Sequence, residues 1–269
     1  MTATTVASGP REGEAGAGDG GTARRWRRLL VRVAEWRPPP VPTVVVVPHP
    51  DDESLMFGGL IGHQRDGGVP VTVVAVTDGE AAYPDVDPSA LALRRRGEQE
   101  AALAVLGVEP GAVVRLGLPD GEVASHHAAV TDAVADLTPP GGLLAAPWLG
   151  DHHCDHEATG RAVATAAART GVDLVYGLFW TWHHTGPDRS AAAPLGRLPL
   201  ADGGARRRRA MAEHRSQTTE GCLRPILGAA ELEPILWEAE YHVIITAGSP
   251  AGFTGRRYPA PAVPVPGRR

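Results

Sequence analysis

Short apolar runs alternate with longer amphipathic segments along the middle of the chain. The runs are rich in valine, leucine and isoleucine, which is typical of strands buried on both faces of a sheet. We predict strands at residues 44–47, 71–76, 113–116, 143–146, 174–182 and 241–246. The intervening segments place apolar residues at helical spacing, and we predict helices at residues 54–65, 91–106, 124–137, 156–170 and 205–217. This alternation predicts one α/β domain, with a mostly parallel sheet covered by helices on both faces.

The two ends of the chain depart from this pattern. Residues 1–21 are small and polar, which predicts disorder, whereas residues 22–37 carry Trp26 and other apolar residues at helical spacing, with arginines between them. We interpret that segment as a basic amphipathic helix packed on the domain; the alternative is peripheral contact with an anionic membrane surface. We therefore divide the chain into a leading segment with a proline linker (1–40), a folded domain (41–248) and a Pro/Gly/Arg-rich tail (249–269).

The composition excludes several functions. All 26 basic residues are arginine, and without lysine neither a Schiff-base mechanism nor a Walker-type phosphate loop is possible. A net charge of −5 provides no chain-wide basic footprint for nucleic acid. Two cysteines do not make a disulfide framework, and no apolar run reaches the roughly 18 residues of a membrane span. We expect a cytoplasmic protein without a nucleic-acid partner or a transmembrane segment.

Two clusters of acidic residues and histidines each follow a predicted strand. P-H-P-D-D-E at residues 48–53 comes after the first strand, and D-H-H-C-D-H at residues 151–156 comes after the fourth. In open parallel sheets, ligands bind beyond the carboxyl ends of the strands. We therefore expect both clusters to face the same edge of the sheet.

These residue types suit a catalytic zinc site. Catalytic zinc takes three protein ligands, commonly imidazole nitrogens and carboxylate oxygens, and keeps one position open for water, whose pKa it lowers to about 7. His49 and Asp52 are close enough across a turn to share an ion, and His156 can supply the third ligand from the facing loop. The alternative is that these residues only cap helices and form loops. Two clusters at one edge favour the metal site.

Other residues of the clusters suit proton transfer in a hydrolysis. Asp51 is adjacent to a ligand and could take the proton of the attacking water. His153 could stabilise an oxyanion and then protonate the leaving amine. Asp155 could fix the tautomer of a neighbouring histidine.

Residues on other predicted rim segments are weaker candidates for substrate binding. Glu80, Arg95 and Asp120 could bind hydroxyl or anionic groups, but as turn or solvated surface residues they need no function. Trp180 and its aromatic neighbours could stack on a sugar ring or simply pack in the core.

Several motifs occur together in the order of a known family. The motif at 48–53 is followed by T-D-G-E at 77–80, R-x-x-E at 95–98, L-P-D-G at 118–121, H-C-D-H at 153–156 and H-R-S-Q at 214–217. Over about residues 43–220 the chain resembles the LmbE-like, or PIG-L, family of zinc-dependent N-acetylglucosaminyl deacetylases. One departure is Cys154, where the family often has proline.

The resemblance implies a Rossmann-like fold and hydrolysis of an N-acyl amide on an amino sugar or its conjugate, a small molecule. It implies zinc ligands His49, Asp52 and His156, with iron(II) as a possible alternative metal. It also implies that Asp51 is the general base and that His153 assists the tetrahedral intermediate, with Asp155 as the partner of His153.

Two other functions remain open from the sequence. Two histidines and one carboxylate also bind iron(II) in oxygenases, although we would expect those on an all-β barrel. The second is a module that binds metal without turnover, which the intact Asp51 disfavours.

Overall fold

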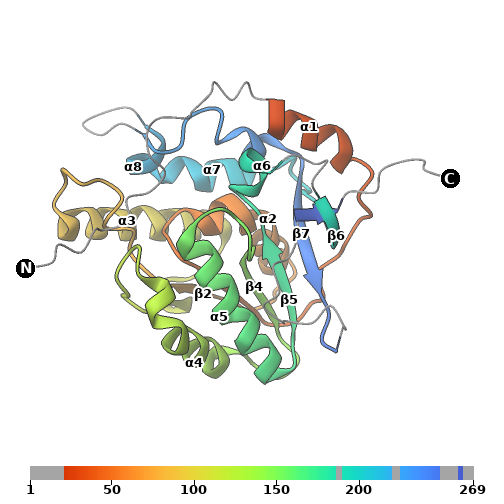
Figure 1. Cartoon of the computed structure of the whole chain (residues 1–269), viewed down its shortest axis with the longest axis horizontal. Helices are drawn as coiled ribbons and strands as arrows, with labels where there is room; N and C mark the ends of the chain where they lie inside the picture. The colour runs from red at the N-terminus through yellow and green to blue at the C-terminus, as the bar shows by residue number, and fades with distance from the viewer. Residues whose placement is uncertain (1–20, 186–189, 220–224, 249–259, 263–269) are drawn as a thin grey trace, which may run out of the picture.

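The computed structural model describes residues 21–185, 190–219, 225–248 and 260–262. Within them one mixed sheet has the strand order β3-β2-β1-β4-β5-β7-β6-β8 (Figure 1). Its strands are β1 (Thr43–Val47), β2 (Val71–Ala75), β3 (Val113–Arg115), β4 (Leu143–Pro147), β5 (Asp173–Gly177), β6 (Ser190–Pro199), β7 (Ala239–Ile245) and β8 (Ala260–Ala262). The first five strands are parallel, and β7 runs antiparallel between β5 and β6. The predicted mostly parallel α/β sheet is confirmed.

Helices cover both faces of the sheet, which explains why β1 is apolar at every position after Thr43. Val44 and Val46 face a core formed with α4 (His127–Leu137) and α5 (Cys154–Thr170). Val45 and Val47 face the opposite core, formed with α2 (Asp52–Asp66), α3 (Pro88–Leu106) and α7 (Ala205–Glu213). Since side chains alternate along a strand, a strand buried on both sides needs a continuous apolar run.

The fifth strand is shorter than the apolar run predicted. β5 ends at Gly177, and a short helix, α6 (Thr181–His184), takes the place of the expected strand end. The Asp151 carboxylate accepts the backbone N–H groups of Phe179, Trp180 and Thr181, at 3.0, 3.2 and 2.9 Å. Those bonds turn the chain away from the sheet after Gly177. The prediction, which rested on apolar residues alone, therefore placed the end of this strand too late.

The late helix is interrupted, and the strand that precedes it was not expected. The predicted helix 205–217 breaks at His214 into α7 and α8 (Arg215–Thr218). Residues 190–199, expected to be irregular, form β6 through pairing with β7. Three 3₁₀ turns complete the elements of the described segments: η1 (Pro110–Ala112), η2 (Val123–His126) and η4 (Glu233–Leu236).

The leading helix packs on the domain. α1 (Gly21–Leu30) is shorter than the predicted 22–37, and Trp26 and Leu30 on it are fully buried. The indole N–H of Trp26 donates to the Thr185 carbonyl at 2.7 Å, and its ring meets Trp182 edge-on at 5.2 Å. Trp26, Leu30 and Val33 are thus covered by protein, as in the packed interpretation. No helix among the described residues is long and apolar enough to cross a membrane.

The ends of the predicted domain scheme are only partly described. The segment predicted to be disordered lies, up to residue 20, outside the described residues. Of the predicted tail, residues 260–262 form β8 beside β6. Its other residues from 249 onward lie outside the described part.

Candidate metal centre and active site

The two predicted clusters meet at the point where the strand order reverses. β1 and β4 are neighbours, yet β1 leads to β2 on one side and β4 leads to β5 on the other. The segments leaving their carboxyl ends therefore diverge and leave a crevice, which is where α/β sheets bind ligands. A cavity of about 650 Å³ opens there, and its lining includes residues from both clusters.

Three predicted ligands converge at the base of this cavity. One oxygen of Asp52, Oδ2, lies 3.2 Å from His49 Nδ1, and the other, Oδ1, lies 3.2 Å from His156 Nε2. Asp52 is the first residue of α2 and His156 lies in the first turn of α5, so two helix starts bring these groups together. All three side chains are buried, and ring nitrogens of His49 and His156 lie with one of His153 within 4.8 Å of one another, which is close enough for one ion.

The outward nitrogens of both histidines are held by carboxylates. His156 Nδ1 lies 2.8 Å from Asp151 Oδ2. His49 Nε2 lies 3.1 Å from Asp120 Oδ1 and 3.3 Å from Asp155 Oδ2. A carboxylate on the far nitrogen fixes the tautomer and the ring orientation of a metal-binding histidine. Asp151 was missed by sequence reasoning, although it is the first residue of the second cluster.

The field of these carboxylates favours positive charge at the centre. Burial lowers the pKa of His156, but Asp52 and Asp151 outweigh it and raise that pKa to about 9. Asp120, Asp155 and Asp52 likewise raise the pKa of His49 against its burial. A bound cation would meet the same attractive field. The donor set of two imidazole nitrogens and a carboxylate, in this field, fits a catalytic zinc ion.

Asp51 borders the cavity in a strained backbone conformation. Its φ of 144° and ψ of −28° lie where non-glycine residues are rare. Arg95 of α3 approaches Asp51 Oδ2 at 3.3 Å and donates to the Pro50 carbonyl at 2.8 Å. Burial raises the pKa of Asp51 to about 6, with Arg95 acting in the opposite direction.

His153 stands beside the two histidine ligands, with ring centroids 4.9 Å from His49 and 4.8 Å from His156. Its Nδ1 accepts the Asp155 backbone N–H at 3.2 Å. Burial, followed by the neighbouring His156 and His49, lowers the pKa of His153 to about 4. A neutral ring with Nδ1 accepting carries its hydrogen on Nε2, where it is available as a donor.

The carboxylate of Asp155 has a different partner from the one the resemblance implied. It contacts His49 rather than His153, and it also accepts the backbone N–H groups of Gly121 at 2.8 Å and Val123 at 3.3 Å. Asp155 is therefore placed to orient His49, and only its backbone N–H orients His153.

The three predicted substrate-binding residues mainly join loops. Glu80 Oε1 accepts the Asp120 backbone N–H at 2.9 Å, and Glu80 is absent from the described residues lining the cavity. Asp120 does line it, but its oxygens hold His49 and the Ala81 backbone N–H.

Arg95 borders the cavity with its side chain mostly covered. It is only 3% exposed, and it donates to the Gly79 carbonyl at 3.0 Å. A Cβ at position 79 would lie 2.2 Å from Arg95 Nη1, so a larger residue there would force this guanidinium to move, in addition to adopting a positive φ of 64°. Its contacts make Arg95 a support for the Asp51 and Gly79 loops.

The remaining cavity wall combines aromatic and aliphatic groups. Phe179 and Trp180 come from the turn held by Asp151, and Leu55 and Leu227 face the same space. Cys154 also lines the cavity as an exposed free thiol, whereas Cys222 lies outside the described residues.

Comparisons with known proteins point to one family of deacetylases. Residues 44–167 match the family model described as PIG-L: GlcNAc-PI de-N-acetylase. A diacetylchitobiose deacetylase of Thermococcus kodakarensis is 31% identical over 145 residues, covering 49% of this chain and 54% of that protein. A 1D-myo-inositol 2-acetamido-2-deoxy-alpha-D-glucopyranoside deacetylase of Mycolicibacterium gilvum is 32% identical over 178 residues, covering 56% of this chain and 62% of that protein. The chain thus matches little more than half the length of these relatives.

The fold has a solved counterpart. The N,N'-diacetylchitobiose deacetylase from Pyrococcus horikoshii, complexed with its inhibitor MPG, superposes with a TM-score of 0.58 at 21% identity, over 76% of this chain and 83% of that chain. This likeness confirms the predicted fold. The family match over residues 44–167 and the sequence relatives agree in making this chain similar to the PIG-L, or LmbE-like, family.

Proposed function

We propose that this chain is a metal-dependent hydrolase that removes an N-acetyl or other N-acyl group from an amino sugar or its conjugate. The observation that carries the proposal is the convergence of His49, Asp52 and His156 at the strand-order reversal, with Asp51 beside them. The two relatives described above are deacetylases by name, which supports the same reaction class. We assign the reaction to the domain of residues 41–248.

His49 Nδ1, a carboxylate oxygen of Asp52 and His156 Nε2 would hold the metal, for which zinc is our first choice and iron(II) the second. When bound, the metal supplies Lewis acidity, which polarises the amide carbonyl and makes water more acidic. An oxygenase reaction at the same ligand set is disfavoured, since this sheet is mostly parallel rather than an all-β barrel.

The chain's own residues would move the protons. Asp51 takes a proton from the attacking water as its oxygen bonds to the carbonyl carbon. The Nε2–H of His153 donates to the oxyanion that develops on the carbonyl oxygen. The C–N bond then breaks as the proton that Asp51 took up passes by way of His153 to the departing amine, so that both residues end as they began. The products are a free amine and an acid, which releases its proton to water and becomes a carboxylate.

The cavity supports a small conjugate as substrate. A volume of about 650 Å³ suits a small-molecule ligand. Trp180 and Phe179 offer ring faces on which the apolar side of a sugar can lie, and Asp120 and Glu122 lie among the polar lining. An amino sugar with an attached group would use both kinds of surface.

The test is acetate release from a panel of N-acetylglucosamine conjugates by metal-loaded protein, with Asp51→Asn as the matched control. We expect Asp51→Asn to keep its metal, because it alters no ligand, and to lose about 10²–10⁴-fold in kcat. Full metal content without acetate release from any conjugate would leave only a metal-binding module. Oxygen uptake that depends on 2-oxoglutarate would instead identify an oxygenase.

A further inference from the structure

Glu53, the second residue of α2, is a fully buried carboxylate directed away from the metal ligands. Its Oε1 is 2.8 Å from His214 Nε2 and accepts from Ser54 Oγ at 2.9 Å. Its Oε2 accepts from Gln99 Nε2 at 3.0 Å and from the Asp51 backbone N–H at 3.2 Å. The carboxylate therefore joins the proposed base to residues far away in the sequence.

The bond to Asp51 restrains a costly conformation. Backbone in this region costs about 1–3 kcal/mol and persists only where the surroundings enforce it. On one side Glu53 binds the Asp51 N–H; on the other, Arg95 holds the Pro50 carbonyl and Asp51 Oδ2. The Asp51 carbonyl accepts from the backbone N–H groups of Ser54 and Leu55, both at 2.9 Å.

His214 compensates the buried charge of Glu53. Both side chains are completely buried, and a buried carboxylate needs a charged, hydrogen-bonded partner. His214 lies at the break between α7 and α8. Glu98 fixes that break by accepting the Ser216 N–H at 2.9 Å and the Ser216 hydroxyl at 2.6 Å.

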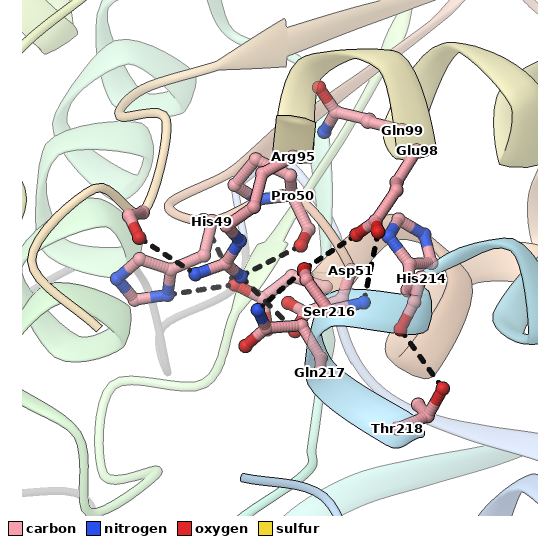
Figure 2. A network of polar contacts seen from close by, with 12 residues as sticks. His49, Pro50, Asp51, Arg95, Glu98, Gln99, His214, Ser216, Gln217 and Thr218 are labelled. Carbon is pink, nitrogen blue, oxygen red and sulfur yellow. Dashed lines mark hydrogen bonds and ion pairs between the residues drawn. The ribbon is translucent and has the colours of Figure 1, made fainter. Parts of the chain in front are cut away.

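One face of α3 therefore supports the whole arrangement. Arg95, Glu98 and Gln99 are spaced so that they lie on one side of the helix. Figure 2 shows Arg95 and Glu98 reaching from α3 to the segments that carry Asp51 and Ser216. The R-x-x-E and H-R-S-Q motifs, which the proposed chemistry leaves without a task, meet in this network.

We propose that Glu53 is a positioning residue for Asp51 and that His214 acts through Glu53. By binding the Asp51 N–H, the Glu53 carboxylate keeps Asp51 in the conformation that presents its side chain to the cavity. The kinetic part of this inference rests on the proposed deacetylase function; the structural part does not.

The first experiment compares kcat and KM for Glu53→Ala and Glu53→Gln on a conjugate that the wild type hydrolyses. Misplacing a catalytic group by about 1 Å can cost about 100-fold, so we expect Glu53→Ala to lose about 100-fold in kcat with little change in KM. Glu53→Gln retains an oxygen for the Asp51 N–H, and we expect it to recover kcat to within about tenfold of wild type.

Glu240 supplies a matched control. It is another buried carboxylate that accepts backbone N–H groups of α2, from Gly59 at 2.5 Å and Leu60 at 2.9 Å, but it has no bond to Asp51. We expect Glu240→Ala to lower the melting temperature while its folded form keeps kcat within about threefold of wild type. A similar kcat loss in both alanine variants would overturn the positioning role, since general loosening would then explain it.

The second experiment is a crystal structure of Glu53→Ala beside the wild type. We expect Asp51 to leave its positive φ in the variant, and an unchanged Asp51 would overturn the inference. Should the wild type release no acetate, the proposed function fails while this comparison still decides the structural claim. If Glu53→Ala does not fold, the test is a double-mutant cycle that compares kcat for Glu53→Gln, His214→Asn and the double variant.

In that cycle, a smaller effect of His214→Asn on kcat in the Glu53→Gln background supports action through Glu53. Additive effects would overturn it.

Discussion

Asp151 is the buried carboxylate whose removal should affect both folding and metal binding. Its Oδ1 accepts from the Phe179 and Thr181 backbone N–H groups and from the Thr181 hydroxyl at 2.7 Å. Its Oδ2 accepts from the Trp180 N–H at 3.2 Å and lies 2.8 Å from His156 Nδ1. Asp151→Asn has the same shape and can keep its oxygen on the Oδ1 side.

The amide nitrogen of the variant then faces the donors at Trp180 and His156. A hydrogen bond to a charged group contributes about 1.5 kcal/mol or more, so losing the Trp180 bond and exchanging the charged His156 bond for a neutral one predicts a destabilisation of about 2 kcal/mol. The amide also donates to His156 Nδ1, which moves the ring hydrogen to Nε2, the nitrogen that faces Asp52. Changing such a partner typically costs about 10–100-fold in metal affinity.

Urea unfolding of metal-free protein measures the first effect, and competition with a chelator measures the second. Asp132→Asn is the control, because Asp132 pairs with Arg169 at the surface, where its side chain is 63% exposed. We expect Asp132→Asn to lower the unfolding free energy by less than about 0.5 kcal/mol and to leave the metal affinity unchanged. An Asp151→Asn protein as stable as wild type, with unchanged metal affinity, would refute the reasoning.

Three further changes test the supports of the fold. Trp26→Ala should lower the unfolding free energy, measured in denaturant, by about 3–5 kcal/mol because it empties a fully buried site. Its control, Arg28→Ala on the exposed face of α1, should change the same quantity by less than about 0.5 kcal/mol. Gly79→Ala should cost about 1–3 kcal/mol in thermal unfolding and lower kcat, because the new methyl group displaces Arg95 at a positive φ; an unaltered kcat would show that Arg95 does not support Asp51. Although burial raises the pKa of Glu240, its ion-pair partners lower it below the usual value, so its stabilisation is present above about pH 4.5 and is lost as the pH falls through the native pKa. The difference in unfolding free energy between wild type and Glu240→Gln should therefore shrink on acidification, and a growing difference would contradict the assignment.

The sequence pattern predicted the sheet well where burial on both faces left a clear signal. The run at β1 could be read directly, because each valine faces one of the two cores. The end of β5 could not, because it depends on Asp151, which lies 28 to 30 residues earlier in the chain. Neither could β6, whose alanine- and proline-containing run is ordered by pairing with β7.

The candidate site divides in the same way. Placement after strands was enough to bring His49, Asp52 and His156 to one edge. The pairing of carboxylates with imidazoles could not be predicted. Three carboxylates, those of Asp120, Asp151 and Asp155, lie near two rings, and the pairing depends on how the loops fold. The Glu53–His214 pair joins residues 161 positions apart, and no local pattern signals such a contact.

The contact between Trp26 and the turn at Thr185 extends the folded unit beyond the residues that the family model matches. A protein trimmed to begin at β1 would lose the indole N–H that donates to the Thr185 carbonyl. It would also expose the part of the Trp182 ring that Trp26 covers. That turn is continuous with the Asp151-bound segment beside His156. Swapping this domain between relatives should therefore succeed only when the leading helix and α6 are exchanged as a set.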